Sequence, residues 1–187
     1  MSDNTAAKIP PQNIAAEKSL LGAILIDEDV LSDASEIVKP KDFYDKNHQT
    51  IFNGMISLYE KHSPVDMLTL TDELKRKNQL EIIGGSAYLS ELTNYVPTAA
   101  HADAYANMVA QKAVRRRLIK ASSEISEMGY DEEADVQEML SKAESELFSV
   151  SDQSLKQDLV SIESILTDSF DRMDDTLLPF FLIYLSG

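Results

Sequence analysis

The 187-residue sequence contains no cysteine, only three histidines, and six glycines and six prolines. The absence of cysteine excludes disulfide bonds and thiolate metal sites. The histidines, His48, His62 and His101, are isolated, because none has a second histidine at the spacing of a metal site. We interpret them as surface or packed side chains and expect no metal site in this chain.

Motifs of phosphate-binding and hydrolytic enzymes are also missing. The sequence has no GxxxxGK[ST] loop and no G-x-S-x-G elbow. We interpret Gly84-Gly85 as a simple turn, and the acidic run Asp27–Asp29 as the end of one helix and the start of the next. No catalytic or cofactor-binding residue is therefore expected.

Long apolar segments are lacking as well. The longest, Leu177 to Leu185, contains a proline and is too short to span a bilayer. The first residues, MSDNTAAKIPPQN, have no apolar core of the kind that a signal peptide needs. The sequence predicts a cytoplasmic protein without membrane contact.

Basic residues become scarce in the second part of the chain. Residues 1–123 carry 16 acidic and 14 basic side chains, whereas residues 124–175 carry 16 acidic and 3 basic ones, a difference of −13. This acidic region is interpreted either as a solubilising surface or as a contact for a basic protein. Both interpretations disfavour direct binding of phosphate backbones there.

Helical periodicity dominates the sequence, and strand signals are few. Asn13, Asp66 and Thr98 can each cap a helix, and short amphipathic helices with brief connections are expected from residue 10 to about 100. The predicted fold is all-α: a compact helical domain, an antiparallel helical hairpin and a tethered linker helix. The predicted boundaries are a tail at 1–9, the domain at 10–102, the hairpin at 103–150, a linker with its helix at 151–175, and an apolar tail at 176–187.

The hairpin is predicted from two apolar stripes with steps of three and four residues on either side of a polar turn at 129–135. We refer to these residues as the hairpin seam: Val114, Leu118, Ala121, Ile125, Met128, Val136, Leu140, Ala143, Leu147 and Val150. Rods of this shape usually pair with copies of themselves or with partner proteins. A further stripe, expected to dock onto another domain or subunit, consists of Leu159, Ile162, Leu166, Phe170 and Met173.

Four segments resemble the DnaB family of replicative DNA helicases, in the order and spacing of that family. Together they cover nearly all of residues 10–120: PPQNIAAEKSLLGAILID (10–27), KPKDFYDKNHQTIFNGMISLY (39–59), PVDMLTLTDEL (64–74) and GGSAYLSELTNYVPTAAHADAYANMVAQKAVRRRLI (84–119). Residues 121–173 resemble the family in the order of their predicted elements, namely a hairpin, a linker and an amphipathic helix, rather than in sequence motifs.

The resemblance implies an architectural role in DNA replication. The domain and hairpin would form a collar above a helicase ring, self-associate as a dimer or hexamer, and bind a DnaG-type primase in the primosome. A helicase loader is a further expected partner, and DNA would be contacted only indirectly. ATP and magnesium would be needed only by the RecA-like motor domain, of which the ending DTLLPFFLIYLSG shows no sign. We expect a truncated chain without motor activity.

Partner contacts are expected at exposed hairpin positions, namely Arg116 and Arg117 near the base and Met128 and Tyr130 near the tip. The run Arg115–Arg117 also allows structural pairing with acidic side chains, which is the favoured interpretation of the run itself. Two other functions are considered: a single-stranded DNA-binding module, and a stand-alone regulator that joins full-length helicase.

Overall fold

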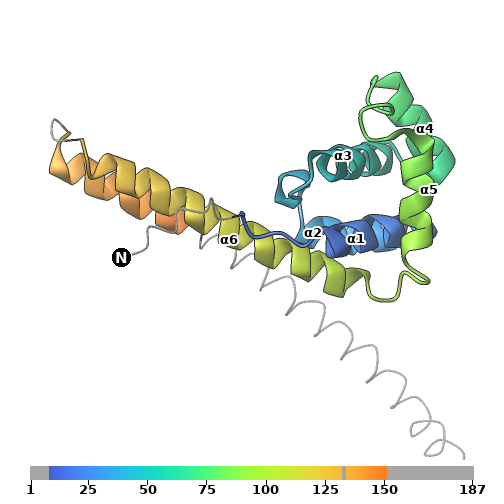
Figure 1. The fold of residues 1–187 in the computed structure, drawn as a ribbon, viewed down its shortest axis with the longest axis horizontal. Coiled ribbons are helices and arrows are strands. Elements are labelled where there is room, and N and C mark those ends of the chain that lie inside the picture. Colours follow the sequence, from blue (N-terminus) through green and yellow to red (C-terminus); the bar gives the residue numbers. More distant parts are fainter. Residues whose placement is uncertain (1–8, 132–133, 151–187) are drawn as a thin grey trace, which may run out of the picture.

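Helices and the loops between them make up the part of the chain that the computed structural model describes, residues 9–131 and 134–150 (Figure 1). The helices are α1 (Ile14–Ile26), α2 (Val30–Ile37), the 3-10 turn η1 (Pro40–Asp42), α3 (Lys46–Glu60), α4 (Met67–Arg76), α5 (Gly85–Tyr95) and α6 (Ala102–Met128). Residues 136–150 form a further helix. The described residues contain no strand, and the predicted all-α class is confirmed.

Polar side chains cap the N-terminal ends of helices at two of the three positions predicted from the sequence. Asn13 accepts a hydrogen bond from the backbone N–H of Ala16, and Asp66 accepts from Leu68 and Thr69. These bonds satisfy amide groups that have no partner within the helix. Thr98, in contrast, does not cap α6. Its hydroxyl accepts from the backbone N–H of Ala100, inside a turn that comes before the helix.

Helix α1 lies at the centre of the body and packs against α5 and α6. Its apolar residues form one cluster with those of α2, α3, α4 and α5, in which Leu20, Ile24, Phe52 and Leu74 are fully buried. Gly22 allows α1 and α5 to approach closely, because a Cβ at that position would collide with the carbonyl oxygen of Leu92.

The Gly84-Gly85 turn is confirmed. Gly84 has a φ of 102° and Gly85 a φ of 71°, values that residues with a Cβ atom rarely adopt. The turn directs the chain from α4 into α5.

Helix α6 has two different halves. Its first half packs on α1 and α2 through five buried residues with small side chains: Ala102, Ala106, Val109, Ala110 and Ala113. The second half leaves the body and runs beside residues 136–150 as an antiparallel arm (Figure 1). Among the described residues after Ala113, only Ala121 is buried. The first half of α6 therefore belongs structurally to the helical body, and the arm begins near Arg116.

Candidate protein-interaction surface on the helical hairpin

The hairpin seam is only partly covered within one chain. Ala121 is buried, and five seam residues are half-buried: Val114, Ile125, Met128, Ala143 and Val150. The other four are about half exposed, namely Leu118 (48%), Val136 (58%), Leu140 (50%) and Leu147 (47%). The expectation that the hairpin covers its own seam was therefore wrong for these four positions.

The second helix faces α6 with a set of residues that shares only Ala143 and Val150 with the predicted seam. Its least exposed positions are Met139, Ala143, Glu146 and Val150, which are spaced by four, three and four residues. Two helices alone cover each apolar stripe from one side only, so a wide stripe stays partly in contact with water.

A shallow groove lies along the exposed face of the arm. It is lined by Leu118, Ile119, Ser122, Ser123, Ser126 and Glu127, and we call it the α6 groove. The hydroxyls of Ser122 and Ser123 donate to the backbone carbonyls of Leu118 and Ile119, at 2.8 and 3.1 Å. These hydroxyls already have an acceptor, so covering the groove with another surface costs little in lost hydrogen bonds to water.

The two candidate contacts near the tip differ in exposure. Tyr130 is 85% exposed, directly after α6 ends, whereas Met128 is half-buried. The ring of Tyr130 is therefore available to a partner, because an exposed tyrosine offers both apolar area and a hydroxyl group.

The two arginines near the base are not exposed positions, which corrects the prediction from the sequence. Arg116 donates to the backbone carbonyl of Pro11 at 2.8 Å and to that of Asp42, and its guanidinium lies 5.8 Å from the ring centre of Tyr44. Arg117 donates to the carboxylate of Asp42 at 2.6 Å. Burial lowers the pKa of Arg116 from its usual value, although an arginine remains charged in a protein.

These bonds anchor the arm to the body. They join α6 to η1 and to the segment before α1, across separations of 105 and 75 residues in sequence. Arg115, which is exposed, lies on another side of the helix. The predicted pairing with acidic side chains is therefore confirmed for Arg117, whereas Arg116 is held by backbone carbonyls.

A buried polar network holds α1, α3 and α5 together, and the sequence analysis missed it. One Glu17 oxygen lies 2.7 Å from Nδ1 of His48, and Nε2 of His48 lies 2.7 Å from the hydroxyl of Tyr88. The same carboxylate accepts from the backbone N–H groups of Tyr44 and Asp45. The signal available in the sequence was a glutamate in the first turn of a largely apolar helix.

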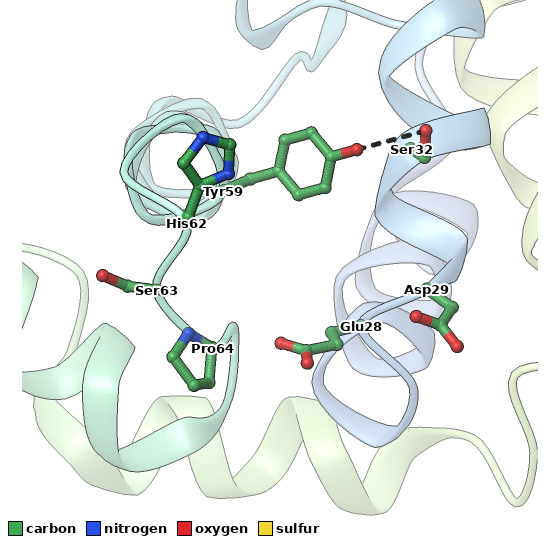
Figure 2. Close-up of a pocket in the computed structure, with 7 residues that line it drawn as sticks. All are labelled: Glu28, Asp29, Ser32, Tyr59, His62, Ser63 and Pro64. Atoms are coloured by element: carbon green, nitrogen blue, oxygen red, sulfur yellow. Dashed lines mark hydrogen bonds between the residues drawn. The ribbon is translucent and has the colours of Figure 1, made fainter.

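A second cleft, of about 330 Å³, lies between the start of α2 and the end of α3 (Figure 2). Seven residues line it: Glu28, Asp29, Ser32, Tyr59, His62, Ser63 and Pro64. Glu28 accepts from the backbone N–H of Val65, and the hydroxyl of Tyr59 lies 3.4 Å from that of Ser32. Within residues 9–131 and 134–150, no group of acidic residues and histidines could hold a metal ion.

The acidic run beside this cleft has local structural roles. Asp27 is the C-terminal cap residue of α1, and its side chain accepts from the backbone N–H of Asp29. Asp29 in turn is the residue before α2. This arrangement is the helix-end and helix-start interpretation that the sequence favours.

The predicted docking stripe of Leu159, Ile162, Leu166, Phe170 and Met173 lies outside the described residues, as does the apolar tail. Within the described part, no helix is long and apolar enough to cross a membrane.

The structure thus defines an all-helical domain with a projecting helical arm whose outer face is partly apolar. Residues 9–111 match the family described as DnaB-like helicase N terminal domain, and the chain belongs to that family.

Known relatives agree with this assignment. The replicative DNA helicase DnaB of Geobacillus stearothermophilus is 41% identical over 174 residues, which make up 93% of this chain and 38% of the relative. The chain therefore spans about two fifths or less of the length of the curated relatives it matches.

Solved structures show the same fold. The N-terminal domain of DnaB helicase from Mycobacterium tuberculosis superposes with a TM-score of 0.72 at 41% identity, covering 75% of this chain and 99% of that one. A DnaB-like replicative helicase, described together with its interactions with primase, has a TM-score of 0.63 at 25% identity, covering 81% of this chain and 35% of that one.

Proposed function

We propose that this chain is a collar and interaction module of a replicative DNA helicase, which self-associates through its hairpin and binds a primase. The main support for this proposal is the outer face of the arm, where Leu118 and Ile119 are 48% and 54% exposed. The neighbouring serine hydroxyls already donate hydrogen bonds to backbone carbonyls. Covering such a surface breaks few hydrogen bonds to water, and the burial of its apolar area makes the free energy of association more favourable.

The shape of the molecule supports self-association. An arm that projects from its body cannot bury its outer face against that body (Figure 1). A second copy carries the same partly apolar stripe, so a two-fold arrangement would cover both stripes at once. A dimer would then be the unit from which a larger collar is built.

Primase is the proposed external partner because a structural relative is described with its interactions with primase. Tyr130 at the tip is the side chain best placed for such a contact, since it is 85% exposed. The proposed role belongs to DNA replication in the cytoplasm and requires no chemistry by this chain itself. A helicase loader remains a further proposed partner.

The test of self-association is the mass of the full chain in solution, measured by light scattering over a concentration series. We expect the wild type to form dimers or larger species, and Leu118→Glu/Ile119→Glu to remain monomeric. Leu68→Glu is the matched control, because Leu68 is 72% exposed on α4, away from the arm. Equal masses for the wild type and the groove variant would overturn the proposal.

The test of primase binding is the affinity of a purified DnaG-type primase for the full chain. Tyr130→Ala should weaken binding by about tenfold, in line with the loss of an aromatic contact at an interface. Tyr59→Ala, which removes an exposed tyrosine ring from α3, is the control and should bind like the wild type. Unchanged affinity for Tyr130→Ala would remove the tip from the primase interface.

A further inference from the structure

A third cleft, of about 300 Å³, lies where η1 meets the middle of α6. Its lining contains four cationic side chains and one carboxylate, so positive charge exceeds negative charge by three. The lining residues are Lys41, Asp42, Ala113, Arg116, Arg117 and Lys120, and we call this site the basic cleft. A recess of low dielectric with an excess of one sign attracts groups of the opposite sign.

The carboxylates near the basic cleft already have partners. Asp42 accepts from Arg117 with one oxygen, at 2.6 Å, and from a backbone N–H group with the other, at 2.8 Å. Glu17, the other carboxylate that acts electrostatically on Arg116, contacts His48 and accepts from two backbone N–H groups. Neither carboxylate can turn toward the remaining cations of the cleft without losing these bonds.

One edge of the Arg117 guanidinium has no acceptor. Its Nη1 donates to Asp42, whereas Nε and Nη2 are buried and have no hydrogen-bond partner in the described part of the chain. Nε and Nη2 lie on the same edge of the planar group, an edge that can bind two oxygens of one oxyanion side by side. Buried donors without an acceptor are unfavourable, so an oxyanion against this edge would stabilise the folded chain.

The two lysines of the basic cleft belong to different parts of the molecule. Lys41 is an exposed residue of η1 in the body, whereas Lys120 lies on the arm, with 77% of its side chain exposed. Lys120 contacts Glu124 at 3.2 Å, but an exposed pair of this kind contributes little to stability. Both ammonium groups can therefore turn toward an anion in the cleft, which would connect the arm to the body.

We propose that the basic cleft binds a diphosphate group, either as inorganic diphosphate or as the diphosphate end of a free nucleotide. A phosphate monoester carries about 1.5 to 2 negative charges near neutral pH, so two linked phosphates match an excess of three better than one does. The Arg117 side chain is 20% exposed, and a rotation at its end brings Nε and Nη2 to the oxygens of one phosphate. Lys41 and Lys120 contact the other phosphate. The site lies within one chain, so it depends neither on self-association nor on primase.

A long nucleic acid is a poorer occupant of the basic cleft than a small anion. Residues 112–120 contain five basic and no acidic side chains, but the chain as a whole has a net charge of −15. An extended phosphate backbone would therefore be repelled by the rest of the molecule, whereas a small anion meets only the local positive charge. The volume of the cleft, about 300 Å³, lies at the small end of the range for small-molecule sites.

The experiment is calorimetric titration of the full chain with inorganic diphosphate, at low salt and without divalent cations. Lys41→Gln/Lys120→Gln should weaken binding by about tenfold, because two cationic contacts are lost. Both positions are exposed, so the variant should fold like the wild type. Diphosphate should also raise the melting temperature of the wild type, since a ligand that binds only the folded state stabilises it, and this shift should shrink in the variant.

Lys75→Gln/Arg115→Gln is the matched control, because it removes the same charge at two exposed positions outside the basic cleft. It should bind diphosphate like the wild type. Orthophosphate should bind about tenfold more weakly than diphosphate, because it offers fewer charges to the lysines. ADP tests the nucleotide source and should bind within about threefold of diphosphate, since Ala113 alone offers apolar contact to a base in the cleft.

Four results would overturn the inference: no binding of diphosphate by the wild type, equal binding by the cleft variant, equal weakening in the control, or tighter binding of a single-stranded oligonucleotide than of diphosphate. The last result would assign the cleft to nucleic acid instead. None of these results bears on self-association or primase binding, so the inference and the proposed function can fail separately.

Discussion

The Glu17 carboxylate lies 2.7 Å from Nδ1 of His48, and both side chains are almost completely buried, with 2% and 0% of their surface exposed. They come from α1 and α3, and the other ring nitrogen of His48 contacts Tyr88 of α5. Each polar atom of the imidazole therefore has a partner, as a ring buried in an apolar core requires. Together, the two contacts of His48 link three helices of the body.

Replacing His48 should reduce stability without changing the surface of the arm. His48→Ala leaves one Glu17 oxygen with a lost partner and opens a cavity, so we expect the free energy of unfolding to fall by about 3 kcal/mol. Chemical denaturation followed by circular dichroism measures the change. His101→Ala is the control, because His101 is exposed and makes no capping bond, and it should unfold within about 0.5 kcal/mol of the wild type. A loss below 1 kcal/mol for His48→Ala would contradict the proposed importance of this network.

Local features of the fold could be predicted from the sequence because their causes are local. The caps at Asn13 and Asp66 and the turn at Gly84 depend on residues within a few positions of one another. The spacing of apolar residues indicates which face of a helix is buried. This spacing predicts helices at 47–61 and at about 103–128, and α3 and α6 begin and end within one residue of these bounds.

Contacts between distant residues could not be predicted in this way. Periodicity shows that a face is buried, but not which side chain of another helix meets it. Glu17 and His48 are 31 positions apart, and Asp42 and Arg117 are 75 apart. The second helix of the hairpin is another example. Two apolar stripes of equal spacing do not determine how each helix is rotated about its own axis, and this rotation decides which residues face the other helix.

The buried carboxylate of Glu73 should make stability depend on pH. Hydrogen bonds from Lys61, Lys77 and Arg76 hold the pKa of Glu73 well below its usual 4.5. In the unfolded chain this carboxyl titrates near its usual value, so on acidification the unfolded state binds the proton first. The contribution of the ionised Glu73 carboxylate to the free energy of unfolding is therefore complete above about pH 4.5. It is lost as the pH falls through the lower pKa of the folded state.

Glu73→Gln tests this dependence. At neutral pH we expect the variant to be less stable by about 2 kcal/mol, because three cations lose their common acceptor. The difference from the wild type should shrink as the pH is lowered from about 5 to about 3, in urea denaturation series at each pH. Asp72→Asn, an exposed neighbour on α4, should follow the wild type at every pH. A difference that stays constant over this range would mean that charge at Glu73 does not stabilise the fold.

The three consecutive arginines should have unequal effects on stability. Arg117→Ala leaves the Asp42 carboxylate, whose side chain is 4% exposed, without its ion-pair partner. Breaking a buried pair in this way should cost about 3 kcal/mol in the free energy of unfolding. Arg115→Ala removes an exposed charge from the same helix and should cost less than about 0.5 kcal/mol. Equal losses in chemical denaturation would contradict the role of Arg117 as an anchor of the arm.

The crossing of α1 and α5 should tolerate no side chain at Gly22. A Cβ there would fall on the carbonyl oxygen of Leu92, which belongs to the helix backbone and cannot rotate away, and it would also approach Val96. Gly22→Ala should therefore lower the free energy of unfolding by about 3 kcal/mol through overpacking, even though alanine is the better helix former. Gly129→Ala is the matched control, because the nearest atom to a Cβ at Gly129 lies 3.5 Å away and its φ is −68°. That variant should be unchanged or slightly more stable, by up to about 0.5 kcal/mol. Similar stabilities of the two variants in thermal and chemical denaturation would show that the two helices can separate without cost, contrary to the close contact seen in the structure.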